Sequence, residues 1–171
     1  PFCFFSKHIE TIFPVLTRKV TDIVFEREQL TLPDGDFLDL DWITNKHSSL
    51  IIISHGLEGN SQSIYLKGFA RAAKNAHYDV LAWNYRGCSE EINRQLRFYH
   101  SGATEDLDTV INHAVNTERY SEIKLIGFSL GGNLTLKYLG EERERTNLLT
   151  KAIAFSVPLN LHTSCIKIST P

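Results

Sequence analysis

The sequence predicts an α/β protein with a mostly parallel sheet and an antiparallel hairpin at its amino-terminal end. Short β-branched apolar runs alternate with helical stretches, which is typical of a parallel sheet. Two extended runs near the start are joined by Pro33-Asp34-Gly35-Asp36, whose residue types favour a tight turn. With 171 residues, 42% of them apolar, the chain is long enough for a single domain over residues 1–171 with a sizeable core.

The predicted strands are short runs of apolar and β-branched residues. The two strands of the hairpin are expected over residues 23–32 and 37–42. Four further strands are expected over residues 50–53, 79–83, 123–126 and 152–157. The run at 50–53 is wholly apolar, which is typical of a strand buried on both faces of a sheet.

The predicted helices carry apolar residues at i, i+3, i+4 and i+7, so that each has one buried stripe. The first stripe consists of Leu66, Phe69, Ala70 and Ala73. The second consists of Leu107, Val110, Ile111 and Ala114, in a helix that begins near Thr104. A third helix is expected from residue 133 to about residue 139. No element is predicted from residue 158 onward.

The charge and the cysteines argue against several classes of protein. A balance of 18 basic and 20 acidic residues, net charge −2, disfavours a nucleic-acid-binding arm or a polybasic membrane patch. Cys3, Cys88 and Cys165 lack metal-ligand spacing, so we expect no zinc site and no disulfide framework, and a reducing, cytoplasmic location. No apolar stretch approaches the roughly 20 residues that span a bilayer, and residues 2–5 show no signal-peptide pattern.

The strongest signal for chemistry is Gly127-x-Ser129-x-Gly131. A nucleophile elbow is a sharp strand-to-helix turn that lifts a serine Oγ above the sheet, and flanking glycines relieve its crowding. The same pattern arises by chance in about one chain in twenty of this length, so its setting decides. A predicted strand precedes it and a predicted helix follows it. We therefore predict that Ser129 is a nucleophile.

The second signal is Ser54-His55-Gly56-Leu57-Glu58-Gly59, directly after the strand expected at 50–53. A hydrolase of this architecture needs two backbone N–H groups that stabilise a developing oxyanion. The residue after the nucleophile supplies the first, which is the N–H of Leu130. The loop after the third strand supplies the second, which we assign to the N–H of Leu57. Taken alone, His55 is more often a hydrogen-bonded structural residue.

The polar loop over residues 84–103 carries Arg86-Gly87-Cys88-Ser89 and Tyr99-His100-Ser101-Gly102. We interpret Arg86 as structural, with its guanidinium satisfying carbonyl groups beneath the site. Cys88 could be read as a nucleophile, but no neighbouring residue in the sequence activates it. His100 could be read as a base, but the base for Ser129 is expected later in the chain.

These motifs resemble the YheT-like branch of the α/β-hydrolases, called AB hydrolase family 4. The resemblance runs from about residue 6 to about residue 160 and covers the amino-terminal half of the family only. Besides the elbow and the loop after residue 53, it rests on His8-Ile9-Glu10-Thr11-Ile12, Arg86-Gly87-Cys88-Ser89, Asn93-Arg94, Tyr99-His100-Ser101-Gly102-x-Thr104-Glu105-Asp106 and Asn133. It implies an α/β-hydrolase fold and a Ser–Asp–His triad in carboxylic ester hydrolases, some of which act on lipid-like esters.

The chain departs from this family after Ser129. The acid and the histidine of such a triad follow the serine, yet no aspartate follows Ser129. Glu141, Glu142 and Glu144 lie in a charge run at the end of the nucleophile helix, and His162 is the only later histidine. We therefore assign no acid and no base, and we expect the carboxy-terminal strands of the family to be absent.

The leading hypothesis is a serine hydrolase that forms a Ser129 acyl-enzyme with a small-molecule ester, without a metal or an organic cofactor. A thioesterase or an amidase would use the same nucleophile. The alternative is a truncated, non-catalytic chain that binds an acyl ligand or a partner. The strand at 152–157 contains no charge and no proline, so as a sheet edge it would favour self-association.

Overall fold

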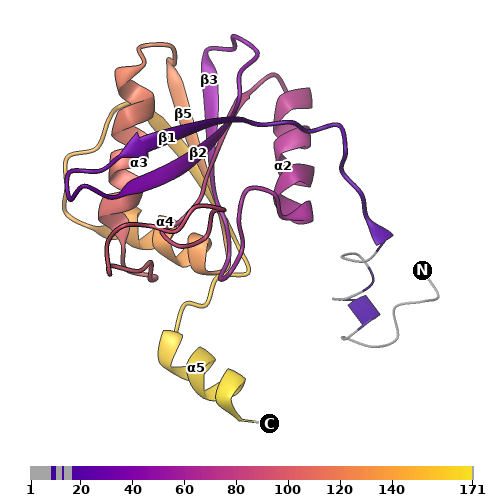
Figure 1. The fold of residues 1–171 in the computed structure, drawn as a ribbon, viewed down its shortest axis with the longest axis vertical. Coiled ribbons are helices and arrows are strands. Elements are labelled where there is room, and N and C mark those ends of the chain that lie inside the picture. Colours follow the sequence, from indigo (N-terminus) through magenta and orange to yellow (C-terminus); the bar gives the residue numbers. More distant parts are fainter. Residues whose placement is uncertain (1–8, 11–12, 14–16, 171) are drawn as a thin grey trace.

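The computed structural model describes residues 9–10, 13 and 17–170, which form a sheet with helices on both faces (Figure 1). Cys3 and most of the amino-terminal motif (His8, Thr11 and Ile12) lie outside the described residues. The strands are β1 (Glu26–Thr31), β2 (Phe37–Ile43), β3 (Ser49–Ser54), β4 (Asp79–Trp83), β5 (Glu122–Phe128) and β6 (Leu149–Phe155). The helices are α2 (Ile64–Asn75), α3 (Thr104–Asn116), α4 (Leu130–Gly140) and α5 (Leu161–Ser169).

The sheet has the predicted mixture of parallel and antiparallel strands. Its order is β1-β2-β4-β3-β5-β6 within the described part of the chain. Strands β1 and β2 form the antiparallel hairpin, β2 also runs antiparallel to β4, and β3 runs parallel to β4 and β5, as β5 does to β6. At the hairpin turn the Leu32 N–H donates to the Asp36 carbonyl at 2.8 Å, and Gly35 takes a φ of 81°.

Strand β6 differs from its predicted span of residues 152–157. It begins at Leu149 and ends at Phe155. The predicted start is late because Thr150 and Lys151 interrupt the apolar run, yet they continue the strand with exposed side chains at the edge of the sheet. The predicted end is late because Ser156 takes a φ of 54°, which an extended strand does not accommodate.

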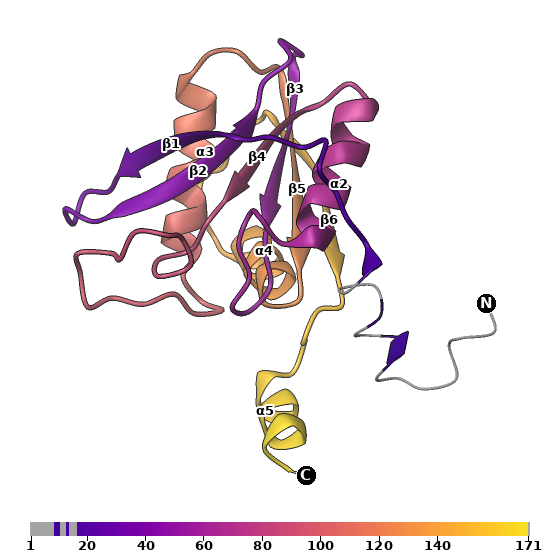
Figure 2. The same ribbon diagram turned by 45° about the vertical axis from the view of Figure 1, so that its right-hand side comes forward.

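Helix α5 contradicts the prediction that no element follows residue 157. The Asn160 side chain accepts a hydrogen bond from the Thr163 N–H at 3.0 Å, which is an N-cap. Leu161, Cys165 and Ile168 then follow at helical spacing. The run of only nine residues is shorter than the stretches that periodicity identifies readily. In Figures 1 and 2 this helix stands away from the sheet and from the other helices.

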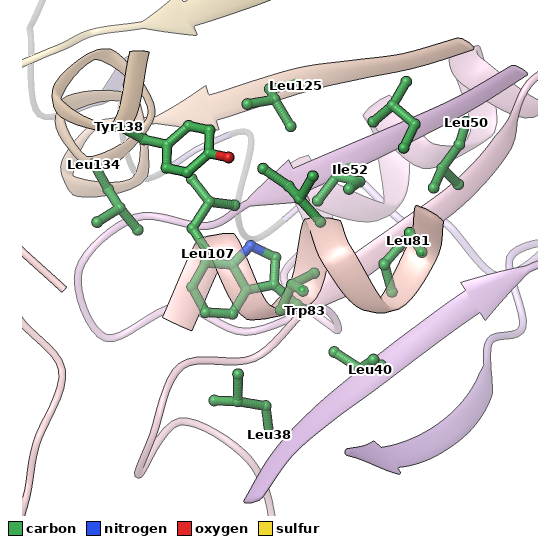
Figure 3. Packing of buried hydrophobic residues seen from close by; sticks show 14 of the residues in the cluster. Leu38, Leu40, Leu50, Ile52, Leu81, Trp83, Leu107, Leu125, Leu134 and Tyr138 are labelled. Carbon is green, nitrogen blue, oxygen red and sulfur yellow. The ribbon is translucent and has the colours of Figure 1, made fainter. Parts of the chain in front are cut away.

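The core consists of two apolar layers, one on each face of the sheet. Leu50 and Ile52 of β3 belong to a cluster with residues of α3 and α4, whereas Ile51 and Ile53 pack with residues of α2. This alternation follows from the two-residue period of a strand. Figure 3 shows the first layer, in which the α3 and α4 side chains gather around Trp83. Burial of each large aliphatic side chain stabilises the fold by about 1.5–3 kcal/mol.

Candidate active site

A strained turn joins β5 to α4 at Ser129. The residue has φ 51° and ψ −113°, a combination that costs on the order of 1–3 kcal/mol for a residue with a Cβ. Two hydrogen bonds hold it: the Ser129 N–H donates to the Phe155 carbonyl at 2.8 Å, and the Asn133 N–H donates to the Ser129 carbonyl at 3.0 Å. The predicted strand–turn–helix setting of Ser129 is therefore present.

This turn requires glycine at positions 127 and 131, because neither position has room for a side chain. A Cβ at Gly127 would lie 2.6 Å from Thr135 Oγ1. A Cβ at Gly131 would lie 2.5 Å from the Ser54 carbonyl oxygen and would also strike the carbonyl of His55. Because Gly131 lacks a Cβ, the first turn of α4 packs directly against the loop that follows β3.

That loop forms a tight turn over residues 56–59. The Gly59 N–H donates to the Gly56 carbonyl at 3.1 Å, and Glu58 at the third position has a left-handed φ of 54°. Such a φ at the third position usually requires glycine or asparagine. The turn is therefore another strained element, and contacts outside the turn must hold it in place.

His55 is one of those contacts, and its role is structural. The imidazole is fully buried, its Nδ1 donates to the Gly56 carbonyl at 2.7 Å, and its Nε2 accepts from the Tyr85 N–H at 3.2 Å. Burial lowers the pKa of His55 to about 4 and outweighs the hydrogen bond to Gly56, so the ring is neutral at neutral pH. The structural interpretation of this histidine is the one that the geometry favours.

The far end of the loop is anchored by a buried polar cluster. The Ser61 N–H donates to Asn84 Oδ1 at 2.9 Å, and the Ser61 hydroxyl donates to the Asp41 carboxylate. Asn84 Nδ2 also donates to Asp41, at 2.9 Å. Burial raises the pKa of Asp41, but hydrogen bonds from Arg27, Ser61 and Asn84 outweigh it, and the net pKa lies below the usual value. No sequence motif reveals this cluster, because its members come from separate segments of the chain.

A cavity of about 340 Å³ brings the predicted site residues together. It is lined by Leu57, Ser101, Ser129, Leu130, Pro158, Leu161, Ser164, Cys165, Ile168 and Ser169. Within the described residues, neither the Leu57 N–H nor the Leu130 N–H has a hydrogen-bond partner. Two larger cavities, of about 450 and 520 Å³, do not include Ser129, although the larger of them shares Leu57 with the Ser129 cavity.

The lining of this cavity contains no histidine, aspartate or glutamate among the described residues. His162 lies on α5 with an exposed side chain and is not part of the lining. Glu141 follows the end of α4, about 18 Å along the helix from Ser129 by its rise per residue, and its carboxylate accepts a hydrogen bond from the Thr104 hydroxyl.

Arg86 is structural, as predicted, but its partners are carboxylates and not carbonyl groups. The buried guanidinium donates to Asp106 through Nε at 2.9 Å and through Nη2 at 3.0 Å. Its Nη1 donates to Asp34 at 2.7 Å and to Asp36 at 3.0 Å. A buried cation needs such pairing, and backbone carbonyls alone would leave its charge uncompensated. The network joins the β1–β2 turn to the start of α3.

The two residues set aside as nucleophile and base have no activating environment. Cys88 is half-buried, and burial raises the pKa of its thiol to about 11 despite a hydrogen bond with Tyr99. His100 is exposed, and its Nδ1 accepts from the Gly102 N–H at 3.1 Å. Only the neighbouring Ser101 reaches the cavity.

Comparison with known proteins places the chain in a family. The profile of Hydrolase_4, described as serine aminopeptidase S33, matches residues 45–168. The chain belongs to this family of α/β-hydrolases. It is 36% identical to the YheT protein of Escherichia coli over 143 residues, covering 81% of this chain and 42% of that one. It is 31% identical to human phospholipase ABHD3, covering 86% of this chain and 38% of that one.

A solved structure shares the fold. The esterase Pf2001 of Pyrococcus furiosus superposes with a TM-score of 0.74 at 20% identity, over 90% of this chain and 62% of that one. The chain thus has part of the α/β-hydrolase fold, and it spans less than half the length of the two curated relatives. In residues 9–10, 13 and 17–170 no helix is long and apolar enough to cross a membrane, and no cluster of three metal-ligating side chains occurs.

Proposed function

We propose that this chain carries the nucleophile and the oxyanion donors of a serine hydrolase that acts on carboxylic esters. The observation that carries the proposal is the strained Ser129 turn in a cavity that is also lined by Leu57 and Leu130, whose N–H groups have no partner among the described residues. Ser129 Oγ would attack the ester carbonyl carbon and lose its proton to water, and the bond from that carbon to the leaving oxygen would break as the alkoxide takes up a proton from water. Water would then cleave the acyl-enzyme to release the acid and restore Ser129.

The cavity lining supports an apolar acyl group as the part of the substrate bound beside Ser129. Leu57, Leu130, Leu161 and Ile168 contribute aliphatic side chains, and the lining holds no charged side chain that would select a polar acid. Apolar lining with a few polar groups is the usual composition of a site for such ligands. The likeness to a phospholipase is consistent with a lipid-like ester.

Ester hydrolysis by the chain and by two serine variants tests this proposal. In mass spectra of the chain treated with a p-nitrophenyl ester, the acyl adduct on residue 129 should be absent from Ser129→Ala, whereas Ser164→Ala, which alters another serine of the same cavity, should still carry it. Turnover by the parent chain should itself be slow, because loss of the base alone costs on the order of 10⁶ in a serine protease, with roughly 10³-fold over water remaining. Absence of an acyl adduct on Ser129 in the parent chain would refute the proposal.

The absence of a histidine or a carboxylate from the described lining favours a second candidate, a non-catalytic chain that binds an acyl ligand. Isothermal titration with a fatty acid distinguishes the two. Binding that persists in Ser129→Ala, with no Ser129-dependent hydrolysis of any ester, would support the second candidate over the first.

We also propose that the chain self-associates through β6, with a second copy as the partner. Strand β6 is an edge of the sheet, and its Ile153 and Phe155 are 53% and 37% exposed. An apolar edge with free backbone groups is a template for pairing. Light scattering after gel filtration should give a mass above 19.5 kDa, and Ile153→Lys should lower it. A cooperatively unfolding monomer of the parent chain would contradict this proposal.

A further inference from the structure

The turn over residues 56–59 has an unusual distribution of hydrogen bonds. Leu57 lies between two residues whose N–H groups are each tied to a tyrosine hydroxyl: Gly56 donates to Tyr65 Oη at 2.9 Å, and Glu58 donates to Tyr99 Oη at 3.0 Å. The N–H of Leu57 itself has no partner within the described residues. The two tyrosines come from different segments, one from α2 and one from the loop before α3.

Tyr99 binds the strained residue of the turn at two points. Besides accepting from the Glu58 N–H, its hydroxyl donates to Glu58 Oε1 at 2.8 Å. The ring is buried and stacks on Tyr85, with centroids 5.3 Å apart. A fixed ring therefore carries a hydroxyl that closes a hydrogen-bonded loop around the residue with the left-handed φ.

Tyr65 restrains the residue on the other side of Leu57 in the sequence, Gly56. Its ring packs edge-on against Phe128, the residue before Ser129, with centroids 5.1 Å apart. The hydroxyl that accepts from Gly56 is thus held by the same segment that carries the elbow. Gly56 and Glu58, the two neighbours of Leu57, are therefore each bound to a tyrosine whose ring packs against another aromatic side chain.

We propose that Tyr65 and Tyr99 are positioning residues that aim the Leu57 N–H at the oxyanion formed on Ser129. The inference rests on the proposed function of Ser129. An oxyanion donor is effective only when its direction is fixed before the reaction, because a flexible donor must be ordered at the transition state. The two hydroxyls occupy the competing N–H groups and leave that of Leu57 as the free donor of the turn. This role also accounts for Tyr99 in the Tyr99-His100-Ser101-Gly102 stretch.

The experiment compares Tyr99→Phe and Tyr65→Phe with the parent chain in two measurements. The first is the rate constant and the half-saturation concentration for labelling of Ser129 by a fluorophosphonate. We expect the rate constant to fall about tenfold in each variant and about 10²-fold in the double variant, with half-saturation unchanged. The second is amide hydrogen exchange, in which Tyr99→Phe should accelerate exchange at Glu58 and Tyr65→Phe at Gly56.

Tyr120→Phe is the matched control. Tyr120 is buried to the same degree as Tyr99 (6% and 7% exposed), and its hydroxyl donates to Asp79 at 3.3 Å, at the start of β4. It should leave the labelling rate and the exchange at residues 56–58 unchanged, so a loss of general stability alone cannot reproduce the expected pattern.

The outcomes separate this inference from the proposed function. Labelling of Tyr99→Phe and Tyr65→Phe at the parental rate, with Ser129-dependent labelling in the parent chain, would overturn the inference and leave the proposed function standing. Absence of Ser129 labelling in the parent chain would refute the proposed function. In that case unchanged exchange at Gly56 and Glu58 in the variants would also overturn the positioning role.

Discussion

The two walls of the Ser129 cavity are held by different means. One wall consists of the elbow and the turn over residues 56–59, which are fixed by buried hydrogen bonds and by the close contact at Gly131. The other wall is α5, which has no buried residue and connects to the body through a hydrogen bond from Asn133 to the Pro158 carbonyl at 3.1 Å. The geometry around Ser129 is therefore fixed by contacts with the body of the protein, whereas the apolar wall formed by α5 is supported by few contacts.

The largest effect should come from a substitution at one of the two closest backbone contacts of the wall formed by the elbow and the turn over residues 56–59. Gly131→Ala places a methyl group against the backbone carbonyls of Ser54 and His55. Neither the backbone of α4 nor that of the segment at residues 54–55 can move aside easily. We expect the free energy of unfolding to fall by more than about 3 kcal/mol. Urea titration measures it.

Gly140→Ala is the control at the other end of the same helix. A Cβ at Gly140 meets no atom within 4 Å, so the change should be neutral or stabilising by up to about 1 kcal/mol. Equal effects of the two substitutions would show that the contact at Gly131 is looser than the structure indicates.

Acid should lower the free energy of unfolding, because His55, which supports the turn over residues 56–59, is buried and neutral in the folded chain. Its pKa is lowered to about 4 by burial, whereas an unfolded histidine titrates near 6.5. The unfolded chain therefore binds more protons between these values, and the free energy of unfolding falls as the pH drops. We expect a loss on the order of 2 kcal/mol between about pH 6.5 and pH 4.5. Urea titrations across this range measure it.

The buried carboxylates lose their contribution in a lower range of pH. Burial raises the pKa of Asp36, but hydrogen bonds from Asn93, Arg94 and Arg86 outweigh it, and the net pKa lies below 3.8. Stabilisation by Asp36 is thus complete above that value and is lost only in stronger acid.

The protonation state of His55 can be measured directly. Nitrogen NMR should show the proton of neutral His55 on Nδ1. A ring that becomes protonated near pH 6.5 would contradict this account.

The smallest effect on stability is expected on α5. Ile168 is 83% exposed, so Ile168→Ser should change the free energy of unfolding by less than about 0.5 kcal/mol. The same substitution should raise the half-saturation concentration of a long-chain alkyl fluorophosphonate several-fold, because Ile168 lines the cavity. Ile92→Ser, at an 89% exposed residue outside this lining, is the control. A large loss of stability in Ile168→Ser would mean that α5 is more firmly attached than its contacts suggest.

Elements that depend on neighbouring residues could be predicted from the sequence, whereas contacts between distant segments could not. The elbow was predictable because Gly127, Ser129 and Gly131 act within one local turn, and the strands because apolar runs identify them. The Tyr99–Glu58 contact joins residues 41 positions apart, and Arg86 meets Asp34 and Asp36 from 52 and 50 positions away. Such convergence depends on the packed fold. Helix α5 was missed because it is short and buries no stripe that would produce a periodic signal.

Peptide mapping by mass spectrometry after fluorophosphonate treatment tests the central claim most directly. The lining of the cavity includes four serines, Ser101, Ser129, Ser164 and Ser169. The three serines other than Ser129 therefore serve as internal controls for the labelling. Only Ser129 lies on the strained turn beside both free N–H groups. We predict a single modified residue, Ser129, at a rate that falls in Tyr99→Phe. Modification of Ser101, Ser164 or Ser169 with Ser129 left unmodified would contradict the account.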